Sequence, residues 1–332
     1  MIVMNYIDLF SGAGGFSLGF KDAGFKNVFS LDSNKEFNKT YSFNFPKDIL
    51  IEKDITKISI KEIKRLVNNK KIDVIIGGPP CQGFSIAGKI GRKFIDDSRN
   101  QLFKEFVRIV DVLKPKVFVM ENVARLYTHN KGLTKKEIIS AFNEIGYDVD
   151  CKILCSADYG VPQIRNRVIF IGNRLNLKNK FPQKIFNKYI PIKNAIDDLP
   201  KLKSGQTSTI PNHESMNHKK EMLSKMNFIK DGGNRSQIPK HIRPKSGDVR
   251  KYIKYDSKKP SICITGDMRK VFHYNQNRAL TVRELARIQS FPDNFIFKGS
   301  KISQQQQVGN AVPPLMAKEI ALRIKEMLNK YD

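Results

Sequence analysis

The stretch YIDLFSGAGGF, residues 6–16, decides the fold because it joins an apolar strand to a glycine-rich turn and the start of a helix. Glycine adopts positive φ at no steric cost and lets the backbone approach a ligand closely. The glycines at 12, 14 and 15 do not match the Gly-x-Gly-x-x-Gly spacing of dinucleotide sites. Asp32 ends the next apolar run, about 20 residues further on, where a carboxylate suits ribose hydroxyls. We therefore expect a site for a nucleoside ligand without a pyrophosphate.

Residues 1–175 alternate between short apolar runs and helical patterns. We predict strands at 4–9, 28–32, 72–76, 116–120, 149–155 and 167–172, and helices at 15–24, 34–44, 60–69, 99–113 and 133–145. This alternation predicts an α/β fold with a mostly parallel sheet and helices on both faces. Ligands bind such sheets beyond the carboxyl ends of the strands. Four polar residues are expected at that edge: Asp8, Asp32, Cys81 and Glu121.

The chain changes character near residue 180. Residues 180–275 are rich in Pro, Gly, Lys and Asn and show no sustained helical period. A helical pattern returns over residues 278–288, where Thr281 and Glu284 have the spacing of a capping box, and a last helix is predicted over residues 315–329. We expect a smaller domain at 179–275, inserted into a larger one formed by residues 1–178 and 276–332.

The segment GGPPCQGFS, residues 77–85, places Cys81 directly after two prolines at the end of an apolar run. Proline fixes φ, so a cysteine that follows it at the tip of a strand has a well-defined position. A thiol presented in this way is typical of a nucleophile, whereas a small buried side chain is the alternative. Cys81 is therefore the candidate nucleophile.

Glu121 follows another apolar run and is expected at the same edge of the sheet, where a carboxyl group can act as a proton donor. A carboxylate at a helix start is the alternative interpretation. Arg165 and Arg167 alternate along an extended segment, so we expect their side chains on one face. By themselves, these arginines are more typical of a solvated basic strand.

The 332 residues are 40 % hydrophobic and carry a net charge of +27. Residues 201–275 contain 17 Lys and Arg against 6 Asp and Glu, a net charge of +11. A field of this sign favours a polyanion such as nucleic acid, although a biased genome would also enrich Lys, Asn and Ile. The sequence therefore favours a basic surface in this region.

Four cysteines, at positions 81, 151, 155 and 263, form no disulfide framework and no metal-binding pattern. We expect no metal. No apolar run approaches the roughly 18–20 residues of a membrane span, and the N-terminus shows no signal-peptide pattern. The expectation is a cytoplasmic protein with no membrane association.

Six segments, in order along nearly the whole chain, resemble the motifs of bacterial C5-cytosine-specific DNA methyltransferases of restriction-modification systems. They are DLFSGAGGF at 8–16, PPCQ at 79–82, ENV at 121–123, QIRNR at 163–167, RALTVRE at 278–284 with QSFPD at 289–293, and QVGNAVPP at 307–314. One such segment can arise by chance, whereas six in order indicate the family. The resemblance implies a Rossmann-like enzyme that uses S-adenosyl-L-methionine and releases S-adenosyl-L-homocysteine.

The resemblance also implies the reaction. The Cys81 thiolate would add to C6 of a cytosine flipped out of duplex DNA, and C5 would then accept the methyl group. Glu121 would protonate N3 and contact the exocyclic amine. Arg167 would contact the cytosine carbonyl oxygen, and Arg165 would support the thiolate and the backbone.

The resemblance assigns a set of cofactor-binding residues. They are Phe10, Ser11, Gly12, Gly14, Phe16, Asp32, Ser33, Asp54, Ile55, Pro80, Leu102, Asn310 and Val312. Asp32 would bind the ribose, and Asp54 would accept from the adenine amino group, although Asp54 also suits an N-cap. Many relatives carry a bulky aromatic residue at the position of Ser33, so adenine stacking is expected to be weaker or to come from Phe16.

By the same resemblance, residues 179–275 form the target-recognition domain. The candidate DNA-binding residues are Gln82, Ser85, Arg99, Gln163, Arg235, Arg243 and Arg269. Arginine can read guanine edges, but most side chains of a DNA-binding face contact phosphate. The implied partner is double-stranded DNA in the nucleoid. A restriction endonuclease that acts separately is compatible with the resemblance, and we expect a monomer.

Three other functions are considered. A transfer-RNA methyltransferase of the same fold would carry a Cys-Phe-Thr segment, which the chain lacks. A non-catalytic relative would have lost Cys81, Glu121 or the arginines. A nicotinamide oxidoreductase fits the glycine turn but leaves the Pro-Pro-Cys segment without a purpose.

Overall fold

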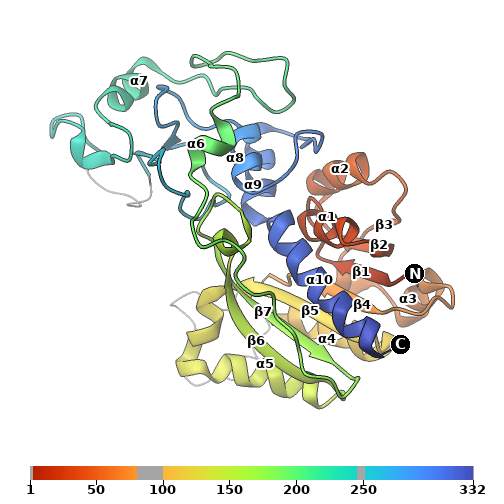
Figure 1. Cartoon of the computed structure of the whole chain (residues 1–332). Helices are drawn as coiled ribbons and strands as arrows, with labels where there is room; N and C mark the ends of the chain where they lie inside the picture. Colours follow the sequence, from red (N-terminus) through yellow and green to blue (C-terminus); the bar gives the residue numbers. More distant parts are fainter. Residues whose placement is uncertain (1–2, 81–99, 245–250, 332) are drawn as a thin grey trace. The chain divides into compact units, whose positions relative to one another are not determined.

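The computed structural model describes residues 3–80, 100–244 and 251–331, which form two compact units (Figure 1). Unit 1 comprises Met1–Cys155, Asn166–Gln183 and Pro314–Asp332, and unit 2 comprises Ser156–Arg165 and Lys184–Pro313. Unit 2 thus continues past residue 275, where the sequence places the end of the recognition domain. The predicted domain of residues 179–275 is defined by DNA recognition and not by compactness, so its boundaries stay a prediction.

Unit 1 contains, within the described ranges, a seven-stranded sheet of order β3-β2-β1-β4-β5-β7-β6. The strands are β1 (Asn5–Leu9), β2 (Lys26–Asp32), β3 (Leu50–Glu52), β4 (Val74–Gly77), β5 (Val117–Val123), β6 (Asp148–Cys155) and β7 (Asn166–Asn173). β7 runs antiparallel to both neighbours, and the other pairs are parallel. The predicted α/β fold with a mostly parallel sheet is therefore confirmed. β3 was not predicted, since three residues are too short for a periodic signal.

Helices cover both faces of this sheet. They are α1 (Gly15–Asp22), α2 (Lys35–Asn44), α3 (Ile60–Val67), α4 (Gln101–Leu113), α5 (Leu133–Asn143) and α10 (Pro314–Tyr331), with the 3-10 turns η1 (Ile55–Lys57) and η4 (Ala124–Gly132). On one face, helices α3, α4 and α5 pack against strand residues such as Leu9 and Phe118. On the other face, the ring of Tyr6 in β1 packs on Phe20 of α1 at 5.5 Å. Alternate residues of β1 thus serve opposite layers.

α10 brings the end of the chain back to α1 (Figure 1). The contact is close because Gly19 has no side chain, and a Cβ built there would lie 2.4 Å from the Cβ of Ala317. The last helix predicted from the sequence therefore packs on α1. Side-chain caps explain where neighbouring helices begin: Asn34 accepts from the backbone of α2, and Ser59 accepts from that of α3.

Unit 2 is built from short elements. They are η5 (Ser156–Tyr159), α6 (Ile192–Ile196), α7 (Lys220–Asn227), η6 (Arg235–Gln237), β8 (Ile253–Lys254), β9 (Val271–Phe272), α8 (Val282–Ile288) and α9 (Lys301–Asn310). Part of its core is a cluster of Met226, Ile229, Ile238, Phe272 and Ala279. α9 was not predicted, because its run of glutamines carries no apolar period.

α8 begins at Val282, four residues later than the pattern over 278–288 predicts. Thr281 is the extended N-cap of a complete capping box with Glu284, as predicted. Arg278 lies before the helix, where its buried guanidinium donates to both carboxylate oxygens of Glu284 at 2.8 and 2.6 Å. The helical pattern at 278 therefore reflects a buried ion pair and not a helical turn.

Neither unit, over residues 3–80, 100–244 and 251–331, contains a helix long and apolar enough to cross a membrane. In the same part of the chain, no group of three or more His, Cys, Asp or Glu side chains is arranged to hold a metal ion.

Candidate active site

The turn after β1 has a strained backbone. Phe10 has a φ of +65°, which non-glycine residues rarely adopt. Its N–H and that of Ser11 both donate to the carbonyl oxygen of Leu31, at 2.8 and 3.2 Å. These bonds tie the turn to the end of β2. Strain of this kind persists where the surrounding structure imposes it, often at ligand sites.

Two glycines of the turn face different surroundings. Gly12 has a φ of +54°, and a Cβ built on it would meet no heavy atom within 4 Å. Gly14 has a φ of +96°, and a Cβ there would lie 2.3 Å from the ring of Phe45. Gly14 is therefore fixed by packing beneath it, whereas Gly12 offers a bare backbone surface. We call residues 10–14 together with Asp32 the glycine cradle.

Asp32 is anchored at the end of β2 by backbone groups. One carboxylate oxygen accepts the N–H of Gly12 at 2.9 Å, and the other accepts the N–H of Asn34 at 2.7 Å. Burial raises the pKa of Asp32, although these N–H groups partly offset that effect. Ser33 beside it is exposed, so the cradle has a carboxylate at its rim but no aromatic ring directly after it.

Asp54 caps the short turn η1. One of its carboxylate oxygens accepts the N–H and the hydroxyl of Thr56, each at 2.9 Å. The Thr56 N–H lowers the pKa of Asp54, so the carboxylate is charged at neutral pH. Ile55 is 2 % exposed, and its carbonyl oxygen accepts a bond from Arg108 at 3.3 Å. The N-cap role considered for Asp54 is confirmed, and it leaves the second oxygen of the carboxylate for another donor.

The other predicted cofactor residues differ in burial and belong to both units. Phe16 is buried and packs edge-on against Phe20 at 5.6 Å, which gives its ring a partner inside unit 1. Pro80 is exposed, and Leu102 is half-buried in the first turn of α4. Asn310, the exposed last residue of α9, and the buried Val312 belong to unit 2, and their cofactor roles stay predictions.

Asp8 does not line the edge of the sheet, contrary to the prediction. It is 1 % exposed and faces α1, where the Ser17 hydroxyl donates to its carboxylate at 2.6 Å. Burial raises the pKa of Asp8 to about 8. The residue was misplaced because its side chain lies one pleat before the strand end, on the face that α1 covers.

Glu121 and Arg167 form an ion pair at the carboxyl end of β5, with 2.8 Å between the carboxylate oxygen and Nε. The antiparallel register pairs Val123 with Arg167 and Glu121 with Ile169. Glu121 and Arg167 are therefore diagonal neighbours on one face of the sheet. Their side chains are 12 % and 13 % exposed, so the carboxylate is held in place and largely shielded from water.

The backbone leaving β4 lies against this carboxylate. A Cβ built on Gly78 would stand 3.1 Å from the second oxygen of Glu121. The side-chain amide of Asn122 donates to the carbonyl oxygen of Pro79 at 3.0 Å. We call Gly78, Pro79, Glu121, Asn122 and Arg167 the β5 corner. Gly78 and Asn122 belong to the segments 77–85 and 121–123, but sequence reasoning missed their roles. Their positions, directly before Pro-Pro and directly after Glu121, are the signal that could have identified them.

Four predicted site residues, Cys81, Gln82, Ser85 and Arg99, lie outside the described residues. Their roles stay predictions. The description resumes at Asn100, and α4 begins one residue later.

Arg165 has different partners from Arg167. It lies just before β7, in unit 2, where its buried guanidinium donates to the carbonyl oxygens of Ile264 and Gly309 at 3.0 and 2.8 Å. Gln163 is also fully buried there, and its amide bonds to the N–H of Ile264 and to Gln289. Both side chains cross-link segments of unit 2 that are far apart in sequence.

The predicted base-reading arginines lie in unit 2. Arg243 donates to the carbonyl oxygens of Ile238 and Ser236 at 2.8 and 2.5 Å, which closes a local turn. Arg269 is 54 % exposed and pairs with Asp267 at 2.8 Å. Arg235 begins η6 and is half-buried. Of these three side chains, Arg269 is the one the structure leaves most accessible to a ligand.

The chain matches the family of C-5 cytosine-specific DNA methylases over residues 4–326. It is 58 % identical over 324 residues to the type II methyltransferase M1.HphI of Haemophilus parahaemolyticus, covering 98 % of this chain and 87 % of the relative. It is 37 % identical over 371 residues to the type II methyltransferase M.DdeI of Desulfomicrobium norvegicum, covering 97 % of this chain and 88 % of that relative.

Among solved structures, a prophage-encoded E. coli protein described as a DNA modification methyltransferase superposes with a TM-score of 0.80. The two sequences are 27 % identical, and the match covers 98 % of this chain and 99 % of that one. The match over nearly the full length, together with the geometry of the β5 corner and the glycine cradle, leads to one conclusion: the chain belongs to the family of C-5 cytosine-specific DNA methylases.

Proposed function

We propose that this DNA cytosine-C5 methyltransferase transfers a methyl group from S-adenosyl-L-methionine to a cytosine flipped out of duplex DNA, within one short sequence. The observation that carries the proposal is the Glu121–Arg167 pair, held against the backbone that leads into Pro79, Pro80 and Cys81. A proton donor, a cationic partner and the attachment point of a thiol are what addition to a pyrimidine ring requires.

In the proposed reaction, the Cys81 thiolate forms a bond to C6, and the carboxyl proton of Glu121 passes to N3 as charge develops on the ring. The resulting enamine makes C5 nucleophilic, and C5 accepts the methyl group. Loss of the C5 proton to a base then breaks the bond between sulfur and C6 and returns the thiolate, while the N3 proton returns to the Glu121 carboxylate. Arg167 holds the Glu121 carboxyl in place and donates to the cytosine carbonyl oxygen.

The glycine cradle supports S-adenosyl-L-methionine as the cofactor. The open backbone face at Gly12 and the anchored carboxylate of Asp32 fit a nucleoside better than a pyrophosphate. Asp32 would hold the ribose hydroxyls, and the second oxygen of Asp54 would accept from the adenine amino group. When bound, the cofactor supplies an electrophilic methyl group on a sulfonium, so the protein needs no metal for this step.

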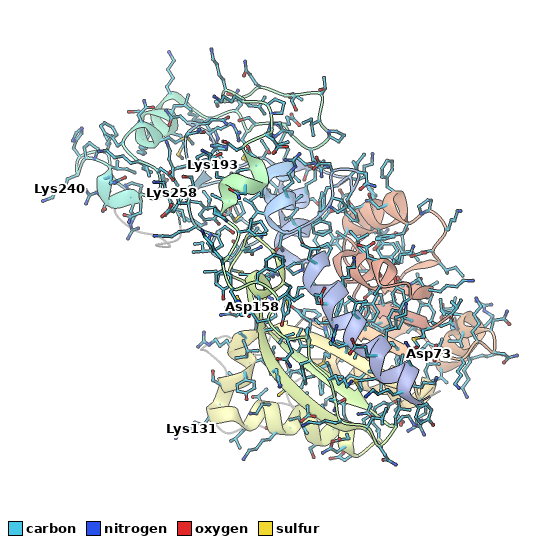
Figure 2. The ribbon with its side chains drawn as sticks, in the orientation of Figure 1. Asp73, Lys131, Asp158, Lys193, Lys240 and Lys258 are labelled. Carbon is cyan, nitrogen blue, oxygen red and sulfur yellow. The ribbon has the colours of Figure 1, made fainter. Side chains whose placement is uncertain are left out.

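Double-stranded DNA is the proposed substrate, and residues 179–275 the proposed recognition domain. This segment has a net charge of +11 over residues 201–275, and Lys193, Lys240 and Lys258 project from the surface of unit 2 (Figure 2). Gln163 stays a proposed DNA-binding residue, and Arg165 would support the backbone segments of unit 2 that it cross-links. The type II relatives support a place in a restriction-modification system. The proposal adds an endonuclease that acts separately and a methyltransferase that works as a monomer.

The test is base-resolution bisulfite sequencing of DNA from a methylation-deficient bacterial host that expresses the chain, beside a Cys81→Ala control. We expect modified cytosines at one position of a short sequence, and none in the control. Soluble protein that binds S-adenosyl-L-methionine yet leaves every cytosine unmodified would contradict the proposal. Equal methylation by the Cys81→Ala variant would remove the covalent step.

A further inference from the structure

The hydrogen-bond ladder between β4 and β5 ends just before the Pro-Pro segment. The last pair in the parallel register is Gly77 with Met120. Pro79 and Pro80 have no N–H groups, so they cannot extend the ladder by donating to β5. Some other interaction must therefore hold the chain to β5 where it leaves the sheet.

Asn122 supplies that interaction. Its side chain is buried, and Nδ2 donates to the carbonyl oxygen of the buried Pro79 at 3.0 Å. Its Oδ1 accepts the N–H of Val123 at 2.9 Å, so both ends of the amide are used and its orientation is fixed. A buried carbonyl without a donor is costly, so this bond determines where the turn settles.

The opposite side of the same turn contacts Glu121. Successive residues of a strand point to opposite faces of the sheet, so the side chains of Glu121 and Asn122 diverge. Yet Asn122 bonds Pro79 while the Glu121 carboxylate lies against Gly78, 3.1 Å from where a Cβ would stand. Glu121 and Asn122, neighbours in β5, therefore contact Gly78 and Pro79, neighbours in the turn after β4, from opposite faces of the sheet.

We propose that Asn122 is a positioning residue for the methyl transfer. With Gly78, it sets the spacing between the Glu121 carboxyl and the backbone that carries the next residues, Pro80 and Cys81. The inference rests on the proposed function, in which these two groups act on opposite edges of one cytosine ring. Misplacement by about 1 Å can cost about 100-fold in rate, so a single buried hydrogen bond can decide the rate of the covalent step.

The test uses a DNA duplex that carries the recognition sequence found by sequencing, with 5-fluorocytosine at the target position. Fluorine replaces the C5 proton that must leave, so the adduct between Cys81 and C6 persists after methyl transfer and can be counted on a denaturing gel. The full chain is mixed with this duplex and S-adenosyl-L-methionine under single-turnover conditions. Calorimetric titration gives the cofactor Kd, and thermal unfolding gives the Tm.

We expect Asn122→Ala to slow adduct formation about 10- to 100-fold while the cofactor Kd changes by less than about twofold. The matched control is Asn173→Ala. Asn173 is another buried asparagine of unit 1, bonded to Leu177 and Asn179, at the opposite end of the β5–β7 ladder from Asn122. The control should lower Tm but form the adduct at the wild-type rate, because its bonds lie away from the β5 corner.

Adduct formation by Asn122→Ala at the wild-type rate would overturn the inference, as would slowing of both variants in step with their loss of Tm. If Asn122→Ala does not fold, Gly78→Ala tests the same spacing, since the added Cβ pushes on the Glu121 carboxylate, and wild-type rates there would also overturn it. A wild-type protein that forms no adduct would reject the proposed function itself.

Discussion

The glycine cradle and the β5 corner lie on the same sheet but are built by different means. The cradle is formed by backbone: N–H groups of Gly12 and Asn34 anchor the Asp32 carboxylate, and Gly12 leaves the backbone surface uncovered. The β5 corner is held by side chains, through the ion pair of Glu121 with Arg167 and the hydrogen bond from Asn122 to Pro79. The cradle therefore depends on backbone geometry, including positive φ at Gly12 and Gly14, whereas the β5 corner depends on the chemistry of single side chains.

The sharpest test of this contrast is Glu121→Gln. The amide keeps the shape of the side chain but cannot donate the carboxyl proton, so we expect methyl transfer to slow by about 10²- to 10⁴-fold. The cofactor Kd should stay within about twofold. Single-turnover transfer of a radiolabelled methyl group measures the rate, and Glu326→Gln, on the partly exposed surface of α10, is the control. A comparable loss of cofactor affinity would show that the β5 corner also serves cofactor binding, contrary to the contrast between the two regions.

The converse test is Asp32→Asn. It removes a charge that accepts two backbone N–H groups and faces the proposed ribose site, so cofactor affinity should fall about 10- to 100-fold. The methyl-transfer rate at saturating cofactor should change much less than it does in Glu121→Gln. Calorimetry measures the affinity, with Asp22→Asn at the exposed end of α1 as the control. Unchanged cofactor affinity would show that Asp32 does not bind the cofactor.

Asp8, in the same sheet, belongs to neither region, is buried against α1 and is expected to affect the stability of the fold. Its folded-state pKa of about 8 lies above the ordinary value of 3.8, so the folded protein keeps a proton that the unfolded chain releases. The free energy of unfolding should therefore fall, through this group, as pH rises from about 4 to about 8. Because Asp8→Asn does not titrate, the difference in unfolding free energy between the two proteins should change by about 1 kcal/mol per pH unit. Parallel pH profiles in urea unfolding would show that Asp8 is already charged.

The smallest expected effect is at Ser33, the exposed residue after Asp32. An aromatic side chain there can stack on an adenine whose ribose is held by Asp32, so Ser33→Tyr should tighten cofactor binding about 2- to 10-fold. The Tm without cofactor should not change, because Ser33 is exposed. Weaker binding in calorimetry would place the adenine elsewhere.

Much of the fold was predictable from local pattern. The strands of unit 1 except β3 and the helices α1 to α5 appear within a few residues of their predicted bounds, because apolar period, glycines and caps act over short distances. α9 was missed, since a glutamine-rich run carries no apolar period, and α8 begins at the predicted Thr281 cap and not at 278, where the helical pattern starts. In the site, the residue types at the strand ends were predictable, but Asp8 was misplaced, since burial depends on which helix covers which pleat.

The sequence by itself determined the family, the α/β class and the residue types available for chemistry, because motifs and periodicity are local properties of the chain. Tertiary structure alone decided which of those residues meet. The antiparallel register of β7 places Arg167 diagonally opposite Glu121, where the two form an ion pair, while Arg165, two residues earlier, bonds carbonyl groups in unit 2. Asn122 reaches Pro79 across 43 residues of sequence. Such contacts depend on strand order and register, which arise from packing between distant segments and leave no local pattern in the sequence.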